Sequence, residues 1–128
     1  MLSSIKPLHT DKAPSPIGPY SQAVESNGLV FISGQIPLDP ATNQIAGTTI
    51  EEQAQQSLTN LLVILEAAGL SSSNLVKTTV YLRSINYFEA FNRIYSDRLG
   101  DAKPARAVVE VSGLPKNVLV EIDAIACR

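Results

Sequence analysis

Cysteine and histidine are almost absent from this sequence, which has one of each, Cys127 and His9, in 128 residues. A single cysteine cannot form an intrachain disulfide, which is typical of a protein from a reducing compartment. A Cys–His nucleophilic pair would require the two ends of the chain to meet. No cluster of cysteines and histidines has the spacing of a metal site, and no glycine loop has a phosphate-binding pattern. We therefore expect neither a metal nor another cofactor.

Long apolar runs and a surplus of one charge are also missing. The longest purely aliphatic run, residues 61–65, is far too short to cross a bilayer, and residues 1–7 have no signal-peptide core. Ten Lys and Arg against 12 Asp and Glu give a net charge of −2, and the basic residues are scattered. Binding of nucleic acid as the main activity is therefore disfavoured. We expect a cytoplasmic protein without a membrane partner.

The composition is that of an ordinary globular protein. The chain is 45% hydrophobic and 17% charged, and 128 residues are enough to bury a core. It shows no internal repeat, linker or low-complexity segment. We therefore expect a single domain over residues 1–128.

Two strands predicted near the C-terminus carry charged residues. Residues 103–111 and 119–126 are rich in β-branched side chains and are separated by turn formers. Arg106 lies on the first strand, and alternation places Glu121 and Asp123 on one face of the second. An arginine fork can bind a carboxylate through two parallel hydrogen bonds, and a half-buried glutamate can move protons or position water. The residues leave open the alternative of a cross-strand ion pair at the rim of a sheet.

The N-terminal part predicts a short strand over residues 5–10 and then a stiff loop. Three prolines and a glycine over residues 13–20 exclude both a helix and a regular strand. The loop ends in the aromatic hydroxyl of Tyr20, which suggests that the loop is held against something; the alternative is a proline-rich turn with Tyr20 as a lid over the core.

A β-hairpin follows this loop. Its arms are residues 21–25 and 29–35, and the turn signal between them is Ser-Asn-Gly at 26–28. The second arm runs into Ser33 and Gly34. A glycine at a strand end lets a ligand approach the backbone closely, and the serine adds a hydroxyl that can donate or accept.

The first helix is predicted between Thr49 and Gly69. Thr49 and Glu52 form a capping box, apolar residues then recur at helical spacing, and Gly69 is a typical C-terminal residue. A strand over residues 75–82, partly apolar on both faces, comes next.

The second helix is predicted to begin near Asn86 and to end at Gly100. Its apolar stripe contains aromatic residues, and Asn92 lies at the edge of that stripe. Asn92 is either a buried amide paired with the backbone or a residue of a site.

The order of elements predicts an α+β two-layer sandwich. Right-handed crossovers place both helices on the same face of one mixed sheet. The other face then has no cover from this chain, although several strands are apolar on both faces. Such a face implies association of copies, for which closed cyclic assemblies are the usual solution. A site at the strand ends would lie near a subunit boundary.

Several stretches of the sequence together resemble the Rid family, also called YjgF, and within it the RidA subgroup. The resemblance covers nearly the whole chain, from residue 5 to 126, with the motifs in the family's order. The motifs are GPYSQA at 18–23, FISGQIP at 31–37, VKTTVYL at 76–82, NRIY at 92–95, KPAR at 103–106, LP at 114–115 and VEI at 120–122. The resemblance implies a chorismate-mutase-like fold and a homotrimer with sites between subunits.

The resemblance also implies a 2-iminobutanoate/2-iminopropanoate deaminase. Such an enzyme hydrolyses 2-aminoacrylate, 2-aminocrotonate or their imine tautomers to pyruvate or 2-oxobutanoate and ammonia. By the same resemblance, Arg106 holds the substrate carboxylate and Glu121 positions the attacking water and shuttles protons. The residues implied to line or seat the ligand are Tyr20, Ser33, Gly34 and Asn92.

One position departs from the family's pattern. Val108 stands where many members have a cysteine, so thiol chemistry is lost there, although the hydrolysis does not require it. A regulatory module that binds 2-oxo acids or amino acids is the alternative function. RNA cleavage or translation inhibition, which is reported for some relatives, is opposed by the acidic balance of the chain.

Overall fold

The computed structural model describes residues 4–128. The N-terminal segment that was predicted to lack a signal-peptide core, residues 1–7, lies partly outside the described residues. The two helices are α1 (Ile50–Ala67) and α2 (Phe88–Leu99). The strands are β1 (Lys6–Leu8), β2 (Ala23–Ser26), β3 (Leu29–Gln35), β4 (Leu38–Asp39), β5 (Gln44–Ile45), β6 (Leu75–Leu82), β7 (Ala105–Glu110) and β8 (Val120–Cys127). Short 3₁₀ turns occupy Ser72–Asn74, Ile85–Tyr87 and Pro115–Asn117.

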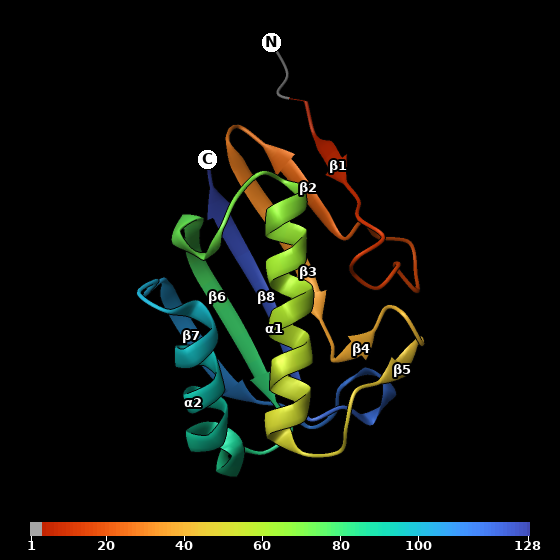
Figure 1. The fold of residues 1–128 in the computed structure, drawn as a ribbon, viewed down its shortest axis with the longest axis vertical. Coiled ribbons are helices and arrows are strands. Elements are labelled where there is room, and N and C mark those ends of the chain that lie inside the picture. Colours follow the sequence, from red (N-terminus) through yellow and green to blue (C-terminus); the bar gives the residue numbers. More distant parts are fainter. Residues whose placement is uncertain (1–3) are drawn as a thin grey trace.

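Six of the strands form one mixed sheet in the order β1-β2-β3-β8-β6-β7. Strand β8 lies between β3 and β6 and is antiparallel to both, whereas β6 and β7 are parallel and are joined through α2. Both helices lie on the same face of this sheet (Figure 1). The predicted two-layer α+β architecture is therefore confirmed.

The predicted elements are all present, and most of their ends differ from the prediction by only a few residues. The capping box holds the start of α1, because the Thr49 hydroxyl accepts from the Glu52 N–H at 3.2 Å and Glu52 Oε1 accepts from the Thr49 N–H at 3.2 Å. The hairpin turn has Asn27 and Gly28 at φ of 54° and 77°, as a tight two-residue turn requires. The β4–β5 ribbon was not predicted: it is a short hairpin inside the predicted loop after β3.

The core lies between the sheet and the helices. Alternation along β8 buries Val120, Ile122, Ala124 and Ala126 under the helices. From α1, the fully buried leucines are Leu58, Leu61 and Leu65, and burial of each such side chain contributes about 2 kcal/mol.

The second face of the sheet is open. Glu121, Asp123 and Ile125 alternate onto it from β8 and are half-buried. Phe31 on β3 and Val109 on β7 are exposed on the same face. Since both helices lie on the opposite side, no element within residues 4–128 covers this face, as the sequence predicted. No helix in the described part of the chain is long and apolar enough to span a membrane.

Candidate active site

A β-bulge in β3 shapes the open face beside β8. The register slips by one residue between Ile32 and Gln35, so Ser33 and Gly34 together lie opposite Asp123. A bulge bends its strand and changes the direction in which side chains point. It therefore presents the serine and the glycine side by side next to the carboxylates of β8.

Glu121 packs directly against the backbone of Gly34. A Cβ at position 34 would overlap Glu121 Oε2 and would lie 2.8 Å from its Cδ. The glycine is therefore required by the close approach of this carboxylate. Burial, and secondarily the nearby Asp123 carboxylate, raise the pKa of Glu121 above its ordinary value. Glu121 consequently binds a proton at a higher pH than an exposed glutamate does.

Asp123 is fixed from the neighbouring strand. The Tyr81 hydroxyl on β6 donates a hydrogen bond to Asp123 Oδ2 at 2.9 Å. This bond, together with burial and the negative charges nearby, raises the pKa of Tyr81. Sequence reasoning placed Asp123 on the face of Glu121 but gave Tyr81 no role, because the contact joins residues 42 positions apart.

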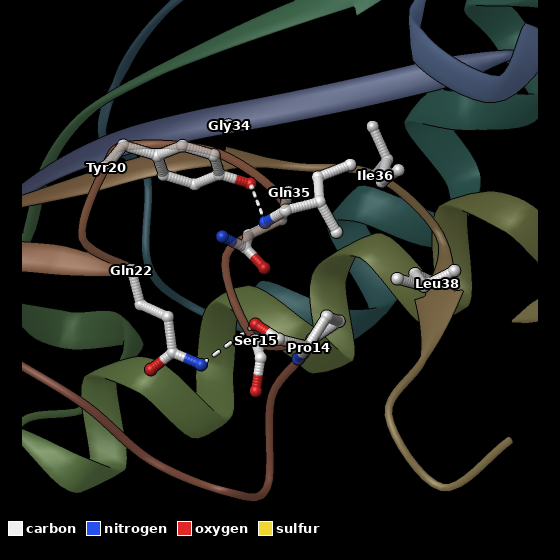
Figure 2. Close-up of a pocket in the computed structure, with 9 residues that line it drawn as sticks. Pro14, Ser15, Tyr20, Gln22, Gly34, Gln35, Ile36 and Leu38 are labelled. Atoms are coloured by element: carbon white, nitrogen blue, oxygen red, sulfur yellow. Dashed lines mark hydrogen bonds between the residues drawn. The ribbon is translucent and has the colours of Figure 1, made fainter. Parts of the chain in front are cut away.

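The proline-rich loop borders the same part of the open face. The Tyr20 hydroxyl accepts a hydrogen bond of 3.4 Å from the Ile17 N–H, and Figure 2 draws a dashed line at this hydroxyl. Tyr20 is 48% exposed, so it is not a lid over the core. An open cavity of about 340 Å³ is lined by Ile17, Tyr20, Ser33, Gly34, Ile36, Pro115 and Glu121. Four of the six predicted site residues thus share one cavity.

Gln22 is a residue of this region that sequence reasoning missed. It is 2% exposed, and its side-chain carbonyl accepts from the Thr10 N–H at 2.8 Å. Its amide donates to the carbonyl of Thr10 at 3.0 Å and to that of Pro14 at 2.9 Å, the bond drawn in Figure 2. The backbone groups of such a loop have no neighbouring strand with which to form hydrogen bonds, so they need side-chain partners. A glutamine side chain directly after the prolines was the feature of the sequence that could have revealed this role. Gln22 anchors the loop that carries Tyr20.

The hydroxyl of Ser33 already has a donor role. Ser33 Oγ donates to the Ser21 carbonyl at 2.6 Å, and the Gln35 amide donates to the Ser33 carbonyl at 3.0 Å. Because a hydroxyl has one proton and two lone pairs, Ser33 Oγ meets a ligand in this conformation as an acceptor.

A second group of predicted residues gathers where β7 meets α2. An Arg106 Nη1 N–H donates to Asn92 Oδ1 at 2.8 Å. The guanidinium carbon lies 4.8 Å from the centre of the Tyr95 ring and 5.7 Å from that of Phe88. Within residues 4–128 Arg106 forms no ion pair, so the alternative of a cross-strand salt bridge is wrong. Asn92 is paired with the guanidinium rather than with the backbone. Val108, two residues after the arginine, is half-buried against the core.

Arg106 and Glu121 lie on opposite faces of the sheet within one chain. In the strand register Arg106 is the partner of Thr78, which is in turn the partner of Ala124, a residue of the helix-covered face. Glu121 is the partner of Tyr81 on the open face. The structure therefore does not bring these two residues together in a single copy.

The remaining candidate groups are dispersed. His9 is bonded to Asp11 at 3.0 Å, and the exposed Cys127 thiol bonds to the Arg128 carbonyl, so the two do not form a nucleophilic pair. Among residues 4–128, no three His, Cys, Asp or Glu side chains gather as metal ligands do.

The chain is similar in sequence and in structure to several known proteins. The family model described as Endoribonuclease L-PSP matches residues 10–128. A RutC family protein of Pyrococcus horikoshii is 51% identical over 121 residues, which cover 94% of this chain and 96% of the relative. A Rid family protein of Yersinia pestis, YyfA, superposes with a TM-score of 0.95 at 44% identity, over 98% of this chain and 100% of that one. Escherichia coli TdcF with bound serine superposes with a TM-score of 0.91 at 42% identity, over 96% and 98%. The fold implied by the resemblance is thus confirmed.

Proposed function

The chain belongs to the endoribonuclease L-PSP family, which includes the RutC and Rid proteins, and on this basis we propose that it is an enamine/imine deaminase. It hydrolyses the 2-imino acids derived from 2-aminoacrylate and 2-aminocrotonate to pyruvate, 2-oxobutanoate and ammonia. The observation that carries the proposal is an arginine fork that no carboxylate of residues 4–128 pairs with. The same chain has Glu121, whose pKa is raised, beside the backbone of Gly34.

Arg106 suits the role of carboxylate anchor. One N–H of its guanidinium is bound to Asn92, and its other donors have no hydrogen-bond partner in residues 4–128. A planar fork binds a carboxylate through two parallel bonds and so fixes the plane of the imino acid. This alignment exposes one side of the imine carbon to an incoming water.

Glu121 suits the role of the group that moves protons. The oxygen of a water molecule attacks the protonated imine carbon while Glu121 takes one proton from that water. The proton then passes to the nitrogen. The C–N bond breaks with its electron pair on the nitrogen, ammonia leaves, and the hydroxyl group gives its proton to the ionised Glu121 as the carbonyl forms. A carboxylate with a raised pKa suits both steps, since it must accept and then return a proton.

The placement of these two residues supports a site shared between copies. Arg106 and Glu121 lie on opposite faces of one sheet, so a site that uses both takes them from different chains. The open apolar face is available for such a contact, and we propose a homotrimer with a site at each boundary. Light scattering after size exclusion should give three subunits per particle, and a stable monomer at micromolar concentration would contradict the assembly.

Mixing two inactive variants tests the shared site directly. In separate preparations, Arg106→Lys and Glu121→Gln should each have little activity. If every site takes its arginine from one copy and its glutamate from the next, random reassembly of an equal mixture restores about a quarter of the sites. Mixed trimers that remain as inactive as the two parents would show that each site lies within one chain.

A coupled assay tests the activity itself. A pyridoxal-phosphate-dependent dehydratase generates the imine in the presence of semicarbazide as a competing trap. The protein should increase the yield of free 2-oxo acid and decrease that of the semicarbazone, and it should do so after treatment with chelator and exhaustive dialysis. Equal yields with and without the protein would refute the deaminase.

Two other functions remain in competition with this one. The bound serine in Escherichia coli TdcF favours a module that binds amino acids or 2-oxo acids without turnover, and such a module would bind 2-oxobutanoate but fail the coupled assay. The family description favours RNA cleavage. The net charge of −2 opposes it, and ribonuclease activity that disappears on repurification would come from a contaminant.

A further inference from the structure

We infer that Tyr95, held by Thr78, is a positioning residue that sets the orientation of the Arg106 guanidinium. This inference rests on the proposed role of Arg106 as the carboxylate anchor. In the sequence, Tyr95 was only one of the apolar residues of a helix and Thr78 only a residue of a strand.

Thr78, Tyr95 and Arg106 form a row of contacts that leads from strand β6 to the Arg106 guanidinium. Thr78 is completely buried, and its hydroxyl shares a hydrogen bond of 2.7 Å with the Tyr95 hydroxyl. The Tyr95 ring, 9% exposed, lies 4.8 Å from the guanidinium carbon of Arg106. Thr78 and Arg106 are also register partners on β6 and β7. The strand pair therefore fixes both ends of the row.

The tyrosine ring is itself held in place. Its hydroxyl is bound to Thr78, and it lies against the Phe91 ring in a tilted arrangement, with 5.6 Å between the centres and 43° between the planes. A ring with its hydroxyl bonded and its body buried has little freedom to rotate. It can therefore act as a fixed surface for a cation above its face.

The ring and Asn92 control different movements of the guanidinium. Contact with the Tyr95 face limits tilting, and the bond from Nη1 to Asn92 Oδ1 limits rotation in the plane of the fork. Tyr95 and Asn92 are three residues apart on α2, so they lie on one side of the helix. Arginine in the exposed edge strand would otherwise sample many rotamers, each of which would present the fork at a different angle. The pair pre-orients it before a carboxylate arrives.

Substitutions at Tyr95 separate this role from simple packing. Tyr95→Leu removes the ring, whereas Tyr95→Phe keeps the ring and removes the bond to Thr78. Phe91→Leu is the matched control, because it removes a buried aromatic ring of the same helix that touches Tyr95 but not Arg106. Melting temperature and particle mass are measured for each variant, so that activity is compared only between assembled proteins.

The kinetic result expected is a loss that depends on Arg106. Tyr95→Leu should lower kcat/KM for the imine by about tenfold or more, as misplacement of a positioning group does, and Tyr95→Phe should lower it by less. In an Arg106→Lys background, Tyr95→Leu should cost under about twofold, because the fork that it orients is already gone. An equal loss in both backgrounds, or an equal loss in Phe91→Leu, would overturn the inference.

A spectroscopic measurement judges the inference apart from the activity. In protein labelled with ¹⁵N, the Arg106 Nε–H proton should show a ring-current shift that Tyr95→Leu strongly reduces, leaving only the part due to Phe88, and that Phe91→Leu largely preserves. An unchanged Arg106 resonance in Tyr95→Leu would overturn the inference whatever the enzyme does. If wild-type protein fails the imine assay while this shift behaves as expected, the proposed function falls and the positioning of Arg106 by Tyr95 stands.

Discussion

Glu121 lies on the uncovered face of the sheet beside a loop, whereas Arg106 lies on the helix-covered side of an edge strand, against α2. The arginine is stacked on Tyr95 and bonded to Asn92, both from one well-packed helix of the same chain. The cavity of Glu121 is bordered by Ile17 and Tyr20, which are 58% and 48% exposed. One half of the candidate site is therefore pre-organised within the chain, and the other half is exposed.

Within a single chain, the separation of the two halves also keeps their charges apart. A glutamate within reach of Arg106 in the same chain would pair with it, and the pair would neutralise both groups. Instead the sheet lies between them, and the acidic neighbour of Glu121 is Asp123. The result, among residues 4–128, is an arginine without an ion pair and a carboxyl group with a raised pKa.

The largest effect is expected when the open half loses its carboxylate. Glu121→Gln should lower imine turnover by about 10²- to 10⁴-fold, the usual contribution of a general acid–base group, with no loss of melting temperature. The amide keeps the shape of the side chain but cannot accept a proton from water. Glu110→Gln is the control, because within the described part of the chain Glu110 accepts a single bond, from the exposed Ile85 N–H, and an amide oxygen can do the same. Comparable losses in the two variants would remove Glu121 from the chemistry.

In the pre-organised half, the sharpest test is Arg106→Lys. It keeps the positive charge and removes the fork, and turnover should fall by about a hundredfold or more, as expected when a positioning contact is lost. The melting temperature should change little, because the side chain is exposed. Arg93→Lys on the exposed side of α2 is the matched control. Near-normal turnover of Arg106→Lys would return this arginine to a structural role.

Gly34→Ala tests how closely the carboxylate of the open half must approach the backbone. The new Cβ would overlap Glu121 Oε2, and the end of this flexible side chain can move aside at small cost in stability. Turnover should therefore fall by about tenfold or more through displacement of the carboxylate, with a modest change in melting temperature. Gly113→Ala is the control, because nothing lies within 4 Å of a Cβ there. If both variants keep wild-type turnover, the contact between Gly34 and Glu121 has no role in catalysis.

Periodicity in the sequence was enough to predict the two layers of the fold. Alternation in residues 119–126 separated the buried face from the face of Glu121, and the capping box located the start of α1. The β4–β5 ribbon was missed because two-residue strands have no periodicity to detect. The bulge in β3 was also invisible, since it appears only when β3 is aligned with β8.

The motifs predict six candidate residues, of which the structure brings four to one cavity, but they do not predict the arrangement. All six positions came from the motifs, yet nothing in the motifs states that Arg106 and Glu121 lie on opposite faces. That fact requires the register of β7 on β6 and of β6 on β8. Gln22, Tyr81 and Tyr95 were missed for a related reason, since their partners are distant in the sequence.

The pH dependence of turnover should also distinguish the two halves, with a smaller effect than the substitutions above. Glu121 must be ionised to accept a proton, so turnover should fall as the pH falls through its raised pKa. Burial raises this pKa most, and the carboxylate of Asp123 on β8 raises it further. The Tyr81 hydroxyl on β6 faces Asp123 and bonds to it. Asp123→Asn removes the negative charge and should move the acid limb of the profile to lower pH. An acid limb that does not move would exclude Asp123 as the cause.

The same raised pKa predicts the sign of a stability effect. The folded state binds the Glu121 proton more tightly than the unfolded state, so ionised Glu121 lowers the free energy of unfolding above that pKa. The cost disappears as the pH falls below the unfolded value. Glu121→Gln should therefore raise the melting temperature more at neutral pH than at acid pH.

The smallest effect is expected where neither half of the site is touched. His9 is exposed and bonded to the exposed Asp11, and the exposed Cys127 is the last residue of β8. Neither side chain lines the cavity of Glu121 or contacts Arg106. A His9→Ala, Cys127→Ser double variant should therefore keep its turnover to within about twofold, as surface changes away from special features do. Turnover and melting temperature are measured beside Glu121→Gln and Arg106→Lys. A large loss of turnover in the double variant without unfolding would place the chemistry near the chain ends, and neither half described above would then be the active site.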